Sequence, residues 1–424
     1  MGEPESKECP CEQISNDFGE KDTEEFPEGG RGWLVLAATF LVLNTTYGMV
    51  NAFGVYQLYY LKHFTGTPTN VISLIGSLQP AVVYFSSIPV VPVINHLGFN
   101  YSLVIGSLIM IFSLMMLSLC KEIWQIYLSQ GILFGFGAGL SFFTAMAAPQ
   151  EWFKRRRALA VGITASGSSL GGVIWPIAVE RLIDQVGFGW TNRIIGFIYI
   201  PILTFSCIAI KARLPRDSSE KYMPNWSVLK DWRFAAMCVA NAIGMLGLFP
   251  PLFYVSTFAE RLGARPSIAN YILAILNAAS LVGRILPPYI ADKTGRLNAL
   301  FPCVLVTGVF LFTFWYPCNS EALLVVFAVL WGMASGTFIA LFPSSLGQLF
   351  GVKDLKSRLS IFFLSCAPFC LAGPLIAGTF IPQGATDTTG FDKLIIFSGV
   401  LFIASSLIVL LVRLSYTTKL KVFI

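Results

Sequence analysis

Twelve apolar stretches, each about as long as a membrane-spanning helix, recur along the chain and constrain its fold more than any other feature. A helix needs about 20 apolar residues to cross ~30 Å of hydrocarbon. With loose bounds, the stretches lie at about 33–60, 70–93, 101–119, 124–148, 158–180, 192–212, 233–258, 267–290, 298–316, 321–346, 358–380 and 391–413. Only 12% of the residues are charged, too few to cover a soluble protein of this size. The sequence therefore predicts an all-α membrane protein with twelve transmembrane helices.

Polar segments divide the chain and place six stretches on each side of a linker. Residues 1–32 carry ten acidic and three basic residues and no apolar run, which predicts a disordered acidic cytoplasmic tail. The expected domains after this tail are an N-terminal six-helix bundle at 33–212, a cytoplasmic linker at 213–232, a C-terminal six-helix bundle at 233–414 and a short cytoplasmic tail at 415–424. The predicted architecture is thus two six-helix bundles.

The distribution of Lys and Arg predicts the orientation in the membrane. With the N-terminus in the cytoplasm, 21 of the 29 basic residues fall in inner segments and seven in outer segments, and Arg284 alone lies inside a helix. Cytoplasmic loops of membrane proteins carry an excess of Lys and Arg. We therefore expect both termini in the cytoplasm, with the cell membrane as the location and an internal membrane as the alternative.

A weak internal repeat supports two pseudo-symmetric halves. Asp292-Lys293-Thr294-Gly295-Arg296 lies between the eighth and ninth stretches, and Asn95-His96-Leu97-Gly98-Phe99 lies at the matching place between the second and third. Only the glycine is common to both. Duplicated halves of this kind are typical of secondary transporters.

Arg284 is the strongest candidate for a binding residue. An arginine at intramembrane depth costs about 2.5–3.5 kcal/mol on insertion scales, so it should face water or a partner. It can anchor an anionic cargo, or it can bond carbonyls freed by Pro287 and Pro288. Asn277, Ser280 and Arg284 are spaced to share one helix face, and Tyr47 and Asn51 share another. Such polar stripes line cavities or join helices.

The loop from Asp292 to Arg296 resembles the signature loop of the major facilitator superfamily, D-R/K-x-G-R/K. The resemblance implies that Asp292 faces a helix N-terminus and Arg296 a carboxylate, latching the cytoplasmic side. Pro288 replaces the first glycine of that motif, and Asn95 replaces the acid of the first-half copy. The latch is therefore expected in the C-terminal half.

Two further segments resemble the monocarboxylate porter family. They are Glu28–Trp33 and the long segment Trp152–Ser169, which includes Lys154, Arg155 and two further arginines. This basic run can set the topology, or it can take a gating role. Asn51–Tyr56 and Asn277–Arg284 resemble the fungal branch, whose members include carriers similar to riboflavin permeases and carriers associated with secondary metabolites.

The chain also departs from the animal monocarboxylate carriers. Asn51 stands where those carriers have a lysine, Ser280 stands where they have an aspartate, and only Arg284 is retained. No acidic residue lies near the middle of any stretch. We therefore expect a facilitator or exchanger, or a carrier whose cargo brings its own proton, rather than proton-coupled lactate transport.

The predicted function is secondary active or facilitative transport of a small organic anion or amphipathic metabolite by alternating access. The expected cavity is lined by the first, fourth, seventh and tenth of the twelve stretches, and the eighth contributes Arg284. An efflux carrier for a fungal secondary metabolite and a non-transporting nutrient sensor are the alternatives. The chain has two His and no G-x-x-x-x-G-K-S/T loop, so we expect no enzyme activity, catalytic residue, metal, cofactor or nucleic-acid partner. The expected partners are the cargo and membrane lipids.

Overall fold

A computed structural model describes residues 29–64, 67, 69–211, 213, 225–351, 355–381 and 387–416. Within these ranges the chain folds into helices and contains no strand. Most of the predicted acidic tail, most of the predicted linker and most of the predicted C-terminal tail lie outside the described residues. The predictions made for those segments therefore remain predictions.

The first part of the chain forms α2 (Arg31–Asn51), α3 (Phe53–His63), α4 (Thr69–Phe85), α5 (Ser87–Leu97), α6 (Phe99–Leu117), α7 (Ile123–Ile126), the π-helical segment η1 (Tyr127–Leu133), α8 (Phe134–Trp152) and α9 (Arg157–Ala209). The second part forms the 3₁₀ turn η2 (Trp226–Lys230), α10 (Trp232–Arg261), α11 (Pro266–Thr294), α12 (Arg296–Phe310), the π-helical segment η3 (Leu311–Trp315), α13 (Glu321–Leu349), α14 (Leu355–Phe380) and α15 (Phe391–Tyr416).

The predicted number of membrane helices is confirmed within the described residues. Eleven helices there are long and apolar enough to cross a membrane, and several join adjacent elements, as α2 with α3. One of the eleven, α9, is 53 residues long and breaks at Gly187, whose φ of 78° and ψ of 166° are not helical. Because a helix needs only about 20 residues to span the bilayer, α9 is two spans, which makes twelve.

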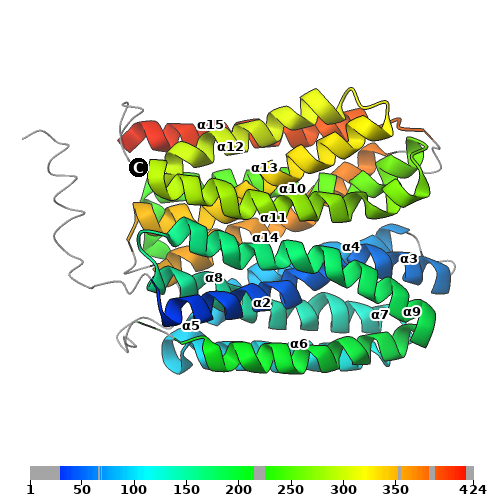
Figure 1. Cartoon of the computed structure of the whole chain (residues 1–424), viewed down its shortest axis with the longest axis horizontal. Helices are drawn as coiled ribbons and strands as arrows, with labels where there is room; N and C mark the ends of the chain where they lie inside the picture. The colour runs from blue at the N-terminus through cyan, green and yellow to red at the C-terminus, as the bar shows by residue number, and fades with distance from the viewer. Residues whose placement is uncertain are drawn as a thin grey trace, which may run out of the picture.

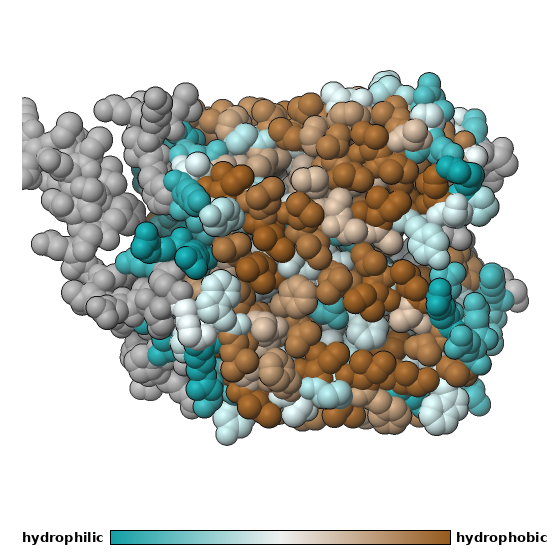
Figure 2. Space-filling view, in the orientation of Figure 1, coloured by the Kyte–Doolittle hydropathy of each residue, from teal (hydrophilic) through white to brown (hydrophobic). Residues whose placement is uncertain are grey.

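The surface of the bundle carries an apolar band. Large apolar side chains such as Ile208 and Leu411 are more than 60% exposed. Figure 2 shows brown, hydrophobic residues across the middle of the molecule and teal, hydrophilic residues at both ends. Exposed apolar area on this scale is stable only in contact with lipid. The chain is therefore a multi-pass membrane protein.

The helices run roughly along one direction, and α2 begins at the same end of the molecule at which α15 finishes (left in Figure 1). We call this end the termini face. In the first half of the chain α2 packs against α9 and α6 against α8, and in the second half α10 packs against α14 and α15. The two halves meet where α9 packs against α11 and α4 against α14.

The two copies of the repeated loop share one backbone geometry. Gly98, between α5 and α6, has a φ of 93°, and Gly295, between α11 and α12, has a φ of 98°. Side chains with a Cβ rarely adopt positive φ, so glycine suits both turns. The one residue that the two copies share is thus the one that the turn requires.

Candidate functional site

A cavity lies between the two halves of the chain. Its wall includes the five predicted helices, which are α2, α8, α10, α11 and α13. It also includes α4, α9 and α14, which we did not predict. The five candidate binding residues all lie on this wall: Tyr47, Asn51, Asn277, Ser280 and Arg284.

Arg284 is buried, with 5% of its surface exposed. Its Nη1 donates hydrogen bonds to the carbonyl oxygen of Ala165, at 2.6 Å, and to Ser168 Oγ. Both acceptors belong to α9, in the other half of the chain. The Nε atom of Arg284 is buried and has no hydrogen-bond partner. The guanidinium is thus held at the junction of the halves through Nη1, while its Nε–H group is unused.

Arg284 does not bond the carbonyls that the prolines of α11 set free. Pro287 removes the N–H group that would have bonded the carbonyl of Gly283. That carbonyl instead accepts a hydrogen bond from Thr337 Oγ1 at 2.8 Å. For the carbonyl freed by Pro287, Thr337 thus supplies the hydrogen bond that the sequence suggested for Arg284.

Three further polar side chains of the cavity wall contact the same region. Asn51 Nδ2 donates to the carbonyl oxygen of Ser168 at 3.4 Å, and Ser169 Oγ donates to Ser280 Oγ at 3.3 Å. Asn277 Nδ2 donates within its own helix, to the carbonyl oxygen of Leu273 at 3.0 Å. Ser280 therefore joins the halves as Arg284 does, whereas the bond of Asn51 lies within the first half.

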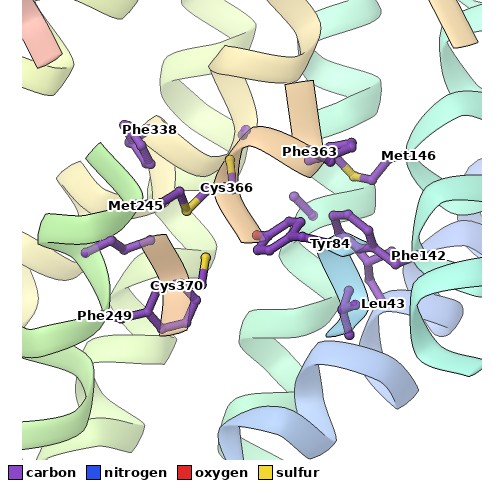
Figure 3. Packing of buried hydrophobic residues seen from close by; sticks show 14 of the residues in the cluster. Leu43, Tyr84, Phe142, Met146, Met245, Phe249, Phe338, Phe363, Cys366 and Cys370 are labelled. Atoms are coloured by element: carbon purple, nitrogen blue, oxygen red, sulfur yellow. The ribbon is translucent and has the colours of Figure 1, made fainter. Parts of the chain in front are cut away.

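Aromatic rings form another part of the wall. Tyr84 and Phe363 stack with their ring centroids 5.8 Å apart, and Phe142 lies 5.1 Å from Phe363 and 5.0 Å from Tyr47. Figure 3 shows Tyr84, Phe142 and Phe363 close together, with Met245 and Phe249 on the other side of the view. Phe and Tyr are so frequent in the chain that no local sequence signal distinguishes these rings from packing residues.

The predicted latch is a buried cluster between α9 and α11. Asp292 accepts hydrogen bonds from the backbone N–H groups of Ala158, at 3.0 Å, and Leu159, at 2.9 Å. These groups begin α9, where the helix dipole favours a negative charge. Arg296 Nη2 lies 2.7 Å from Asp292 Oδ1, and both side chains are largely buried. The carboxylate next to Arg296 is thus Asp292 itself.

One residue of the basic run contacts this cluster, and another is buried elsewhere between the halves. Lys154 takes part through its carbonyl oxygen, which accepts a hydrogen bond from Arg296 Nη2 at 3.1 Å. The side chains of Lys154 and Arg155 are exposed at the termini face. Arg157, which we did not single out, is buried, and its Nη1 donates to the carbonyl oxygen of Gly347 at 2.5 Å.

Contacts between the halves lie between the cavity and the termini face. Besides the Asp292 cluster, Ser87 and Ser360 each donate a hydroxyl hydrogen to the carbonyl oxygen of the other, at 2.9 and 2.6 Å. Lys356 Nζ lies 3.9 Å from the buried carboxylate of Glu151. Together these contacts join the halves on the side of the cavity that faces the termini.

The cavity offers hydrogen bonds and one positive charge, but no reacting groups. Its wall residues include no Asp, Glu or His. Within the part of the chain that the structure describes, no three His, Cys, Asp or Glu side chains gather in a way that could hold a metal ion. The arrangement suits reversible binding of an organic molecule between two packed halves.

Comparison with known proteins shows which family and which transporters this chain resembles. A sequence profile of the Major Facilitator Superfamily matches residues 35–319. "MFS-type transporter 1" of an Ophiocordyceps species is 35% identical, covering 93% of this chain and 88% of that protein. "Agnestins efflux protein AgnL12" of Paecilomyces divaricatus is 36% identical, covering 99% and 96%. "Aspyridones efflux protein apdF" of Emericella nidulans is 35% identical, covering 89% and 77%.

Proposed function

Because the chain belongs to the Major Facilitator Superfamily, we propose that it exports a fungal secondary metabolite that carries a negative charge. The chain is a multi-pass membrane transporter, and at the level of the family it is a carrier rather than an enzyme. Export is favoured because two similar proteins are named as efflux proteins.

The burial of Arg284 in the central cavity is the observation that carries the proposed charge of the cargo. A guanidinium at this depth needs a partner, and its Nε atom has none. A carboxylate accepts two parallel N–H bonds from a guanidinium, which gives both affinity and orientation. We therefore assign Arg284 as the anchor of an anionic cargo, with Tyr47, Asn51, Asn277 and Ser280 as neighbouring contacts.

The proposed mechanism is alternating access by two six-helix bundles, 33–212 and 233–414. In this mechanism the Asp292–Arg296 cluster closes the cavity at the termini face. When the cluster opens and the opposite side closes, the cavity becomes accessible from the termini face. We propose that the termini face is cytoplasmic, because the inner segments hold most of the Lys and Arg. In the cell membrane, this orientation lets cargo enter when the latch opens.

We place the chain in the fungal branch of the monocarboxylate porter family. Asn51 and Ser280 lie on the cavity wall with Arg284, at positions where animal carriers have a lysine and an aspartate. Without a carboxylate on this wall, a proton relay has no buried acid to use. The proposed carrier is therefore a facilitator or exchanger, or takes its proton on the cargo.

The test compares metabolites inside and outside cells that make the wild-type protein, cells that lack it and cells that make Arg284→Ala. We expect an anionic metabolite to accumulate outside only with the wild type, while Arg284→Ala reaches the membrane in equal amount. Lys393→Ala, which changes an exposed cation, serves as the control and should export normally. Unchanged metabolite distributions with and without the protein would contradict the proposal.

A further inference from the structure

A buried polar side chain of α10, Asn241, also faces the cavity, and the anion anchor does not account for it. Asn241 is 0% exposed and lies on the cavity wall. Met245 and Phe249, one and two turns further along the same face of α10, line the cavity with it. An amide among apolar neighbours must have its hydrogen bonds satisfied, because burying an unpaired polar group is unfavourable.

The neighbouring thiol of Cys366 is the hydrogen-bond partner of the amide. Cys366 Sγ donates to the carbonyl oxygen of Phe362, one turn earlier in α14, at 3.5 Å. While that hydrogen is on the carbonyl of Phe362, the sulfur is available as an acceptor. Asn241 Nδ2 donates to it. Its Oδ1 atom is buried and has no hydrogen-bond partner.

Besides the hydroxyl of Tyr47, which also has no partner, the cavity wall thus holds two unused groups of complementary kind on neighbouring helices. Arg284 Nε is a donor on α11, and Asn241 Oδ1 is an acceptor on α10. On the same cavity wall, the stacked rings of Tyr84 and Phe363 and the ring of Phe142 give flat apolar contact area. Such rings pack favourably against an aromatic ring of a bound molecule.

From this arrangement we propose that Asn241 selects cargo that carries a hydroxyl or N–H group on an aromatic ring, away from its acidic group. The inference deepens the proposed function and rests on it. Asn241 Oδ1 accepts the hydrogen of that group, while Arg284 binds the acid. Cys366 is a positioning residue, because it holds the amide with its oxygen free. A molecule that lacks the donor leaves the Asn241 oxygen buried and unpaired, and is disfavoured.

The experiment measures dissociation constants by equilibrium dialysis with the purified full-length protein. The probes are 2-naphthoate and a panel of its ring-hydroxylated derivatives, with one isomer for each open position. We expect at least one isomer to bind the wild type about tenfold more tightly than 2-naphthoate, the gain of one well-made hydrogen bond. Asn241→Leu should remove this preference without weakening the binding of 2-naphthoate.

A pair of cysteine variants separates positioning from general packing. Cys366→Ser keeps a group that donates to Phe362 and accepts from Asn241, so it should keep the preference. Cys366→Ala removes the acceptor, so the amide is free to turn and the preference should fall. Cys370→Ala removes the buried thiol one turn further along α14 and is the matched control, with the preference unchanged.

The possible outcomes distinguish this inference from the anion anchor. Equal affinities for all the naphthoates in the wild type, or a hydroxyl preference that survives both Asn241→Leu and Cys366→Ala, would overturn the role of Asn241. If in either case Arg284→Gln still weakens the binding of every naphthoate to the same extent, Arg284 is the anion anchor. Only the role of Asn241 in selecting cargo is then wrong. If no naphthoate binds the wild type, the aromatic cargo class is wrong, and the metabolite comparison above decides on export by itself.

Discussion

Arg284, on α11, donates a hydrogen bond to the carbonyl oxygen of Ala165, on α9, across 2.6 Å. Because α9 and α11 belong to different halves of the chain, the residue proposed to bind cargo also joins the halves. The anion is proposed to bind the Nε atom of the same guanidinium, which has no hydrogen-bond partner. The proposal therefore places cargo binding at a contact between the halves, which must loosen during transport.

The geometry of Arg284 predicts that its charge alone is not sufficient. Arg284→Lys keeps the charge but loses the planar fork of donors, so we expect transport to fall by about tenfold, the effect of one lost charged hydrogen bond. Arg284→Gln should abolish transport. The measurement is the rate of export per amount of protein in the membrane, for the metabolite found by comparing cells with and without the protein. Normal rates in Arg284→Gln would remove Arg284 from the site.

The latch predicts a local and measurable loosening in Asp292→Asn. The carboxylate accepts two backbone hydrogen bonds from the start of α9 and pairs with Arg296. Charged hydrogen bonds contribute about 1.5–3 kcal/mol each, so amide hydrogen exchange at Ala158 and Leu159 should become about 10–100-fold faster. The control is Asp387→Asn, an exposed carboxylate in the loop before α15. Unchanged exchange at these two amides in Asp292→Asn would show that Asp292 is not the latch.

Close approach of the halves predicts that Gly162 tolerates no side chain. A Cβ atom at this position of α9 would lie 2.0 Å from the carbonyl oxygen of Arg284. Gly162→Ala must therefore separate α9 from α11, and we expect transport to fall by about tenfold or more, since backbone atoms cannot move aside as a side chain can.

The matched control for Gly162→Ala is Gly54→Ala, because a Cβ atom at Gly54 would meet no atom within 4 Å. Transport by this variant should equal that of the wild type. If Gly162→Ala transports cargo as fast as Gly54→Ala, then transport does not require α9 and α11 to approach as closely as they do in this structure.

Much of the fold could be predicted from the sequence because membrane spans depend on local composition. The twelve stretches have the length and apolarity of spans, and the break of α9 at Gly187 falls between the fifth and sixth stretches. The five candidate binding residues could be predicted to line the cavity because they are polar side chains at intramembrane depth, where such residues are rare.

The rest of the site depends on contacts between distant parts of the chain. Arg157 lies in a basic run whose members look alike in sequence, yet it alone is buried against Gly347. Tyr84 and Phe363 are ordinary aromatic residues in an aromatic-rich chain until α4 packs against α14. The unused oxygen of Asn241 follows from a thiol 125 positions away. Local periodicity contains none of this information.

The central claim is that Arg284 lies beside a path that water and cargo can enter, and thiol modification tests it most directly. Arg284→Cys and Ser280→Cys are treated, in intact cells, with a negatively charged methanethiosulfonate that does not cross membranes. Modification is read at each site by mass spectrometry, because the chain has nine cysteines of its own. With the termini face closed, we predict that the reagent modifies both introduced cysteines from outside the cell. Failure to modify either position, from outside the cell or in inverted membrane vesicles, would contradict the claim.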